Sequence, residues 1–133
     1  MTIEQHLAHV AEIIAALMFL VMGASHLIQP RAWVTFFTTL HSQGVVGVFA
    51  NSFLTLMFGM LIVSLHNIWT WPAIILTLIG WAQVLKGAIG FIAPSVSLRG
   101  LAMVRPENEW RFIAAGVPAL ALGLWFLFDA VGR

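Results

Sequence analysis

The longest uncharged stretch of the chain constrains its fold most. Residues 32–85 form a run of 54 residues without a single Asp, Glu, Lys or Arg. One helical membrane span needs about 20 predominantly apolar residues, so this run has room for more than one span. In lipid the backbone must satisfy its own hydrogen bonds, and the run lacks the alternating pattern of a barrel strand. It therefore predicts membrane-spanning helices.

The composition of the whole chain agrees with this prediction and excludes several classes of protein. Of its 133 residues, 61% are apolar and only 8% are charged, too few charges for an ordinary soluble enzyme. The chain has no cysteine, which excludes disulfides, thiolate metal sites, iron–sulfur clusters and cysteine nucleophiles. The net charge is +1 and no run of Lys or Arg exists, so no nucleic acid is expected as a partner.

The hydropathy pattern predicts an all-α membrane protein with a single domain, residues 1–133, built as a four-helix bundle. The expected transmembrane helices are at about residues 10–29, 46–65, 73–93 and 111–129. Pro30 and Pro94 end the first and third helices, because the residue before a proline disfavours the helical region. The short connection at residues 66–72 makes the second and third helices antiparallel.

The first connection is predicted to be an amphipathic helix in the membrane interface. Residues 33–40 carry bulky apolar side chains at helical spacing, and polar residues fill most of the other positions. This pattern places Trp33, Phe36, Phe37 and Leu40 toward the acyl chains. The alternative is a re-entrant or partly buried segment. Residues 96–104 have a poorer version of the same pattern after the third helix.

A weak internal repeat relates the two halves of the chain. Shifting the sequence by 64 residues places Gly23, Ala24, Ile28 and Pro30 on Gly87, Ala88, Ile92 and Pro94, and places Ala50, Leu56 and Gly59 on Ala114, Leu120 and Gly123. Each half then contains a glycine and a helix-ending proline at matching positions. This match predicts two repeated helical hairpins related by an axis along the membrane normal.

The basic residues predict the orientation in the membrane. The first and third connections, with the helix ends beside them, hold five of the six Lys and Arg residues: Arg31, Lys86, Arg99, Arg105 and Arg111. Only Arg133 lies on the opposite side. Because basic residues favour the cytoplasmic side, both termini are expected outside the cytoplasm.

Lys86 is the first candidate for a binding site. It lies roughly 10 Å inside the end of the third helix, and a charge at such depth suggests a function. Gln83 shares the helix face of Lys86. On the second helix a similar depth is expected for Asn51 and its neighbours Ser52 and Thr55. His26 ends the first helix on the same side. An ammonium group among neutral partners would receive a phosphate, a fatty carboxylate or a quinone oxygen. Alternatively, Lys86 extends to the interface and binds nothing.

A second cluster is expected at the opposite membrane surface. His6, His9 and Glu12 share one helix face, and His66 and Asp129 end helices on that side. His9, Glu12 and His66 are candidate metal ligands, since imidazole and carboxylate suit zinc, iron or copper, and histidines on two helices can ligate haem. The cluster lacks a firm metal signature such as H-E-x-x-H. Its residues are also common at interfaces because they are amphipathic.

The fourth helix has small residues at a spacing of four, Ala115, Ala119 and Gly123. Such a ridge allows close helix packing, either within the bundle or with a second copy of the chain.

Several segments resemble known membrane proteins. The sequence GASHLIQP at residues 23–30 resembles the end of the first helix in DoxX-like small membrane proteins. His66-Asn67-Ile68-Trp69, Gly80-Trp81 and Lys86-Gly87 resemble a group of uncharacterised bacterial integral membrane proteins of about this length. The resemblance implies a four-helix bundle in a bacterial inner membrane, with periplasmic termini in the predicted orientation. DoxX-like proteins are linked to redox or sulfur-related complexes, but without cysteine no thiol chemistry carries over.

Three functions are compatible with the sequence. The segments outside the expected helices are small, and few residues suit catalysis. Both features favour a non-catalytic accessory or scaffold subunit that packs against a larger membrane complex or itself. The second is a binder or carrier of a lipophilic or anionic ligand at Lys86. The third is a haem- or metal-dependent redox protein that uses His9, His26 and His66. An enzyme is therefore less expected than a binding or scaffold protein.

Overall fold

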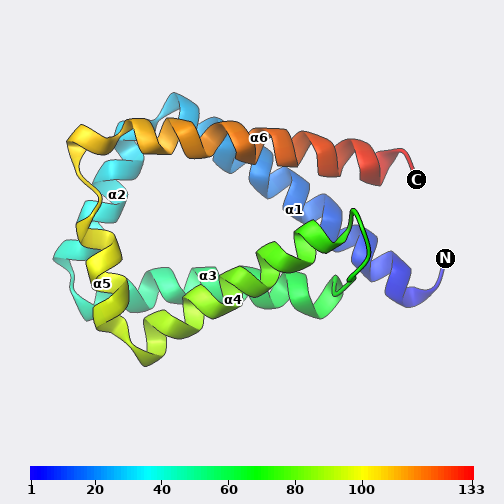
Figure 1. Cartoon of the computed structure of the whole chain (residues 1–133), viewed down its shortest axis with the longest axis horizontal. Helices are drawn as coiled ribbons and strands as arrows, with labels where there is room; N and C mark the ends of the chain where they lie inside the picture. The colour runs from blue at the N-terminus through cyan, green and yellow to red at the C-terminus, as the bar shows by residue number, and fades with distance from the viewer.

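The computed structural model describes all 133 residues, and the chain is entirely helical (Figure 1). Its elements are α1 (Ile3–Ile28), α2 (Pro30–Ser42), α3 (Val45–Leu65), α4 (Ile74–Ile92), α5 (Pro94–Ala102), the short 3-10 turn η1 (Pro106–Asn108) and α6 (Trp110–Val131). The helices α1, α3, α4 and α6 are long and apolar enough to cross a membrane, which confirms the four expected long apolar helices. The first begins earlier than expected because Thr2 and Gln5 cap it reciprocally.

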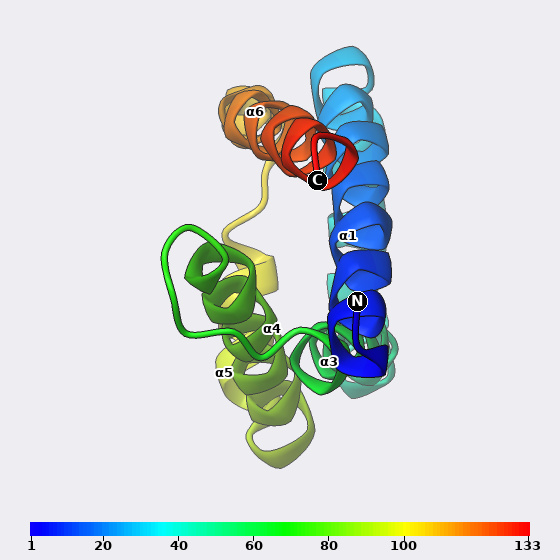
Figure 2. The same cartoon turned by 90° about the vertical axis from the view of Figure 1, so that its right-hand side faces the viewer.

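The long helices form two pairs, α1 with α6 and α3 with α4 (Figure 2). Glycines let the backbones of each pair approach closely. A methyl group added at Gly59 would lie 2.6 Å from the Val84 nitrogen on α4, and one added at Gly123 would lie 2.8 Å from the Leu20 nitrogen on α1. These contacts hold each pair together more tightly than the two pairs are held to one another.

The structure keeps Gly123 of the predicted small-residue ridge on α6 but not Ala115. Ala115 is exposed, whereas Gly116 is buried against the Gly23 carbonyl of α1. The face that packs on α1 therefore runs from Gly116 to Gly123. The smallest residue allows the closest approach of two backbones, so glycine rather than alanine determines the rotation of α6.

The contacts within the two pairs follow the 64-residue offset. A methyl group at Gly87 would lie 2.7 Å from Leu56 Cβ, and one at Gly23 would lie 2.8 Å from the Leu120 nitrogen. Gly87 lies 64 positions after Gly23, and Leu56 lies 64 positions before Leu120. The two contacts are therefore equivalent. The helices of one half do not pack mainly on each other as a hairpin, however. Instead, each half contributes one long helix to each pair.

The short helices α2 and α5 cross the same end of the molecule and connect the two pairs (Figure 1). Each begins with a proline, Pro30 or Pro94, at its first position, where the missing N–H costs no hydrogen bond. The apolar face of α2 differs from its prediction, because it lies mainly against the protein. Leu40 is buried against Val48 and Leu101, and only Phe36 of its four bulky residues is exposed.

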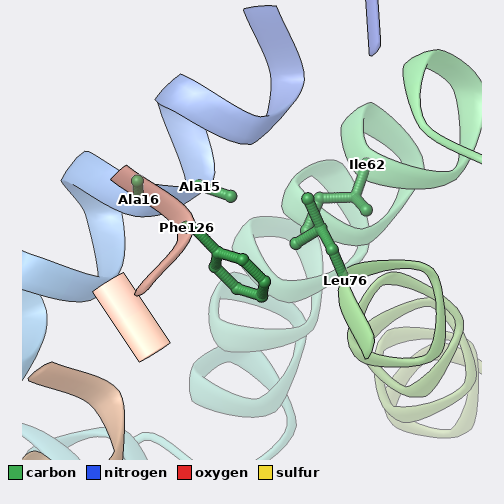
Figure 3. Packing of buried hydrophobic residues seen from close by; sticks show 5 residues of the cluster. All are labelled: Ala15, Ala16, Ile62, Leu76 and Phe126. Atoms are coloured by element: carbon green, nitrogen blue, oxygen red, sulfur yellow. The ribbon is translucent and has the colours of Figure 1, made fainter. Parts of the chain in front are cut away.

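A second apolar cluster joins the pairs toward the opposite end. It contains Ala15, Ala16, Ile62, Leu76 and Phe126 (Figure 3). The small side chains of α1 leave room for the phenyl ring of Phe126, which lies between α1 and the ends of α3 and α4. The two pairs are thus joined at both ends of the molecule.

We expect Gly87→Val to lower the free energy of unfolding by about 1–3 kcal/mol, because its added atoms overlap the Leu56 backbone. Gly23→Val is expected to cost a similar amount, since it makes the equivalent contact. An SDS titration in mixed micelles, followed by circular dichroism, measures both. The control is Gly100→Ala, whose methyl group meets no atom within 4 Å and should leave stability unchanged or slightly higher. Equal unfolding midpoints in all three variants would contradict the packing described here.

Candidate functional site

A cavity of about 600 Å³ lies at the end of the molecule where α2 and α5 cross. This volume is within the usual range for small-molecule sites. Most of its lining is apolar, with contributions from α2, α3, α4, α5 and α6. Its polar side chains are Asn51, Ser52, Thr55, Lys86 and Ser97.

The polar side chains come from three helices. Asn51, Ser52 and Thr55 share one face of α3, because residues four apart on a helix are neighbours. Lys86 reaches the cavity from the adjacent α4, and Ser97 from α5. The Thr55 hydroxyl donates to the Asn51 carbonyl at 2.9 Å.

The other polar side chains of the cavity have no partner within the protein. The ion pairs of the chain do not include Lys86, and no carboxylate lines the cavity. Lys86 is exposed and Asn51 and Ser97 are half-buried, whereas Ser52 is buried against Gly90 of α4. The cavity thus contains an unpaired ammonium group, an amide and hydroxyls within largely apolar walls.

The structure brings together only part of the predicted cluster. Lys86 and Asn51 line the same cavity, but Gln83 and His26 do not. The backbone of Gln83 faces Gly59 at the contact between α3 and α4. His26 belongs to the other pair of helices, where Nδ1 donates to the Met22 carbonyl at 2.6 Å and the imidazole stacks on Trp33. Similar depth in the membrane did not imply a shared face.

The 64-residue offset provides an internal comparison for the polar set. Asn51, Ser52, Thr55 and Lys86 correspond to Ala115, Gly116, Ala119 and Met22. The pair of α1 and α6 thus makes equivalent glycine contacts without any of these polar groups. Packing of the pair therefore does not require Lys86, Asn51 or Thr55, whereas Ser52 packs against Gly90. Ser97 was missed by sequence analysis, because the weak pattern of residues 96–104 did not place it on any face.

The second predicted cluster forms a buried polar network at the opposite end. The side chain of Glu12 on α1 is joined to His66, which follows α3, and to Arg133 beyond α6. Glu12 is 5% exposed and His66 is 1% exposed. His66 Nε2 donates to Glu12 Oε1 at 3.0 Å, and Arg133 Nη2 donates to Glu12 Oε2 at 3.0 Å. Because a carboxylate only accepts hydrogen bonds, Nε2 must carry the proton.

Two further residues complete the network. The Thr77 hydroxyl on α4 lies 3.3 Å from His66 Nδ1, so all four long helices or their ends contribute to the cluster. Arg133 also pairs with Asp129. Partial burial lowers the pKa of Arg133, but the hydrogen bond to Asp129 and the charge of Glu12 raise it more, so its pKa lies above the ordinary value. The cluster thus joins the two helix pairs.

The candidate metal ligands are used within this network. No three His, Asp or Glu side chains of the chain are arranged to hold a metal ion. His9 Nδ1 lies 3.9 Å from Glu12 Oε2, while His66 faces Glu12 and Thr77 with its two ring nitrogens. The cavity beside the network has about 10 Å³, which fits about one water molecule and not a haem.

Comparison of the chain with protein-family models, curated proteins and solved structures finds no match. The DoxX-like resemblance therefore stays a prediction, and the functional argument depends on the geometry of the Lys86 cavity.

Replacing Glu12 by Leu should lower the free energy of unfolding by about 1–3 kcal/mol, because the buried His66 donor loses its acceptor. The same SDS titration measures this change. Glu4→Leu is the matched control, since Glu4 is exposed and forms no ion pair. If both variants unfold at the same SDS concentration, the network does not join the helix pairs.

Proposed function

We propose that this small membrane protein binds an amphiphile with an anionic head group, which the ammonium group of Lys86 receives in the 600 Å³ cavity. The observation that carries the proposal is the unpaired Lys86 side chain beside a cavity with largely apolar walls. A charge within a membrane span is costly unless it has a partner. Neither a carboxylate nor a salt bridge within the chain supplies one.

The chemistry of the lining supports this class of ligand. The Lys86 ammonium group has three N–H donors, and the Asn51 amide and the Ser97 hydroxyl add others. Such donors suit a carboxylate or a phosphate. Leu85, Ile89 and Val96 provide apolar surface for a hydrocarbon tail. The equivalent positions of the other helix pair hold no such polar set, which supports a role in binding rather than in packing.

The two other functions have less support in the geometry. A scaffold role, which the sequence favoured, does not account for an unpaired cation within a cavity. A redox role would use His9, His26 and His66, but His26 is stacked on Trp33 and His66 is held in the Glu12 network. We place the protein in a bacterial inner membrane with the α2 and α5 end toward the cytoplasm, because five of the six basic residues lie near that end.

The proposal predicts that Lys86→Met weakens the binding of radiolabelled palmitate to the purified protein in mild detergent by at least tenfold. This loss corresponds to about 1.4 kcal/mol of binding free energy. Binding of hexadecanol, which has the same tail without the charge, should change by less than twofold. Methionine is the residue at the equivalent position 22, so the variant is expected to fold normally.

Arg99→Met is the matched control for a general loss of positive charge. Arg99 is an exposed cation on the neighbouring α5 that does not line the cavity. Its replacement should leave palmitate binding within twofold of the unchanged protein. Equal palmitate affinity of the Lys86→Met and Arg99→Met variants, or no palmitate binding by the unchanged chain, would overturn the proposed function.

A further inference from the structure

The Lys86 cavity lies beside an asymmetric gap between the helix pairs. On one side of the molecule α1 packs against α3. By the 64-residue offset, the equivalent partners on the other side are α4 and α6, and these two helices make no contact of similar extent (Figure 2). At the α5 end they are connected by the segment that follows α5.

The α4 wall of the cavity is exposed on the lateral surface of the molecule. Leu85 lines the cavity and is 63% exposed. Ile89, which lies one helical turn after Leu85, also lines the cavity and is exposed. An apolar wall that is both part of a cavity and exposed on the side of a membrane-spanning helix faces the acyl chains of the bilayer. The cavity therefore opens on a side of the molecule that would face the hydrocarbon region of a bilayer.

A second cavity of about 250 Å³ adjoins the first at the start of α6. The two cavities share Gly100, Val104 and Phe112 in their linings. Arg111 lines the second cavity and, like Lys86, forms no ion pair. Two cations without an ion pair thus line two adjoining cavities, with Arg111 near the end of the long helices and Lys86 deeper. The Arg111 guanidinium lies over the Trp110 ring.

We infer that the ligand is a phosphate-bearing lipid of the bilayer itself, which enters sideways between α4 and α6. Its head group lies between Arg111 and Lys86, and its tail lies against Leu85 and Ile89. This inference rests on the proposed function. Arg111 suits a phosphate because its guanidinium can donate two parallel hydrogen bonds to the phosphate oxygens. Basic pockets between membrane helices are suited to anionic lipid head groups. The apolar opening requires no passage of the tail through water.

The test uses phosphatidic acid with a photoreactive diazirine in its acyl tail, in phosphatidylcholine vesicles containing the full-length protein. Irradiation and peptide mapping should show labelling of Leu85 and its neighbours that falls at least fivefold when a tenfold excess of unlabelled phosphatidic acid is added. Val21 is the matched control. It is the equivalent residue on α1 and is 67% exposed, so ordinary bilayer lipid should label it without this competition.

A second pair of variants tests the head-group position. Arg111→Met should lower the competed labelling of Leu85 by about tenfold, and palmitate binding in detergent is measured in parallel. Arg105→Met removes an exposed cation that lines neither cavity and should change neither measurement.

The outcomes separate this inference from the proposed function. Equal, uncompeted labelling of Leu85 and Val21 would overturn the lateral position of the lipid tail. Unchanged labelling in Arg111→Met would overturn the phosphate position. In both cases, palmitate binding that depends on Lys86 would leave the proposed function intact. If palmitate does not bind at all, the proposed function fails as well.

Discussion

Close contact between glycines and the backbone of a neighbouring helix determines the architecture of this protein. Within a bilayer no hydrophobic force favours one helix neighbour over surrounding lipid, so close packing decides which helices associate. Gly59 against Val84 and Gly123 against Leu20 fix the two pairs. Because each half of the chain contributes one helix to each pair, α2 and α5 must cross from one pair to the other. Their crossing forms the end of the molecule where the cavity lies.

The two ends of the molecule differ in how their charged side chains are paired. At the end with the termini, Glu12 is paired with both His66 and Arg133, and the network connects the helix pairs. At the other end, Lys86 lines a cavity that has no carboxylate. The first arrangement offsets the cost of burial by contacts within the protein. In the second, the exposed Lys86 has no charged partner within the chain, and an anionic ligand would supply one.

The sequence predicted the long helices well because their determinants are local. Apolar runs of sufficient length, together with Pro30 and Pro94, define where helices lie and where two of them end. The faces of the helices were less predictable. Leu40 was expected toward lipid but packs on Val48 and Leu101, because its neighbours come from segments distant in the sequence. Helical periodicity shows that a face is apolar, but not whether lipid or protein covers it.

The same limit explains the partial prediction of the site. Depth along a helix follows from residue number, so Lys86 and Asn51 were correctly placed at a similar level. The direction in which a side chain points depends on helix pairing, and His26 lies on a helix of the other pair. The glycines that determine the pairing recur 64 residues apart, but the repeat predicted two hairpins, whereas the structure pairs α1 with α6 and α3 with α4.

The repeat also gives the strongest argument about function. Two pairs with equivalent glycine contacts provide two equivalent surfaces, and only one carries Lys86, Asn51, Ser52 and Thr55. The corresponding surface with Met22, Ala115, Gly116 and Ala119 packs in the same way. Ser52 packs against Gly90, but the equivalent glycine contacts do not explain Lys86, Asn51 or Thr55. Since an intramembrane lysine is costly, a binding partner outside the chain accounts for it best.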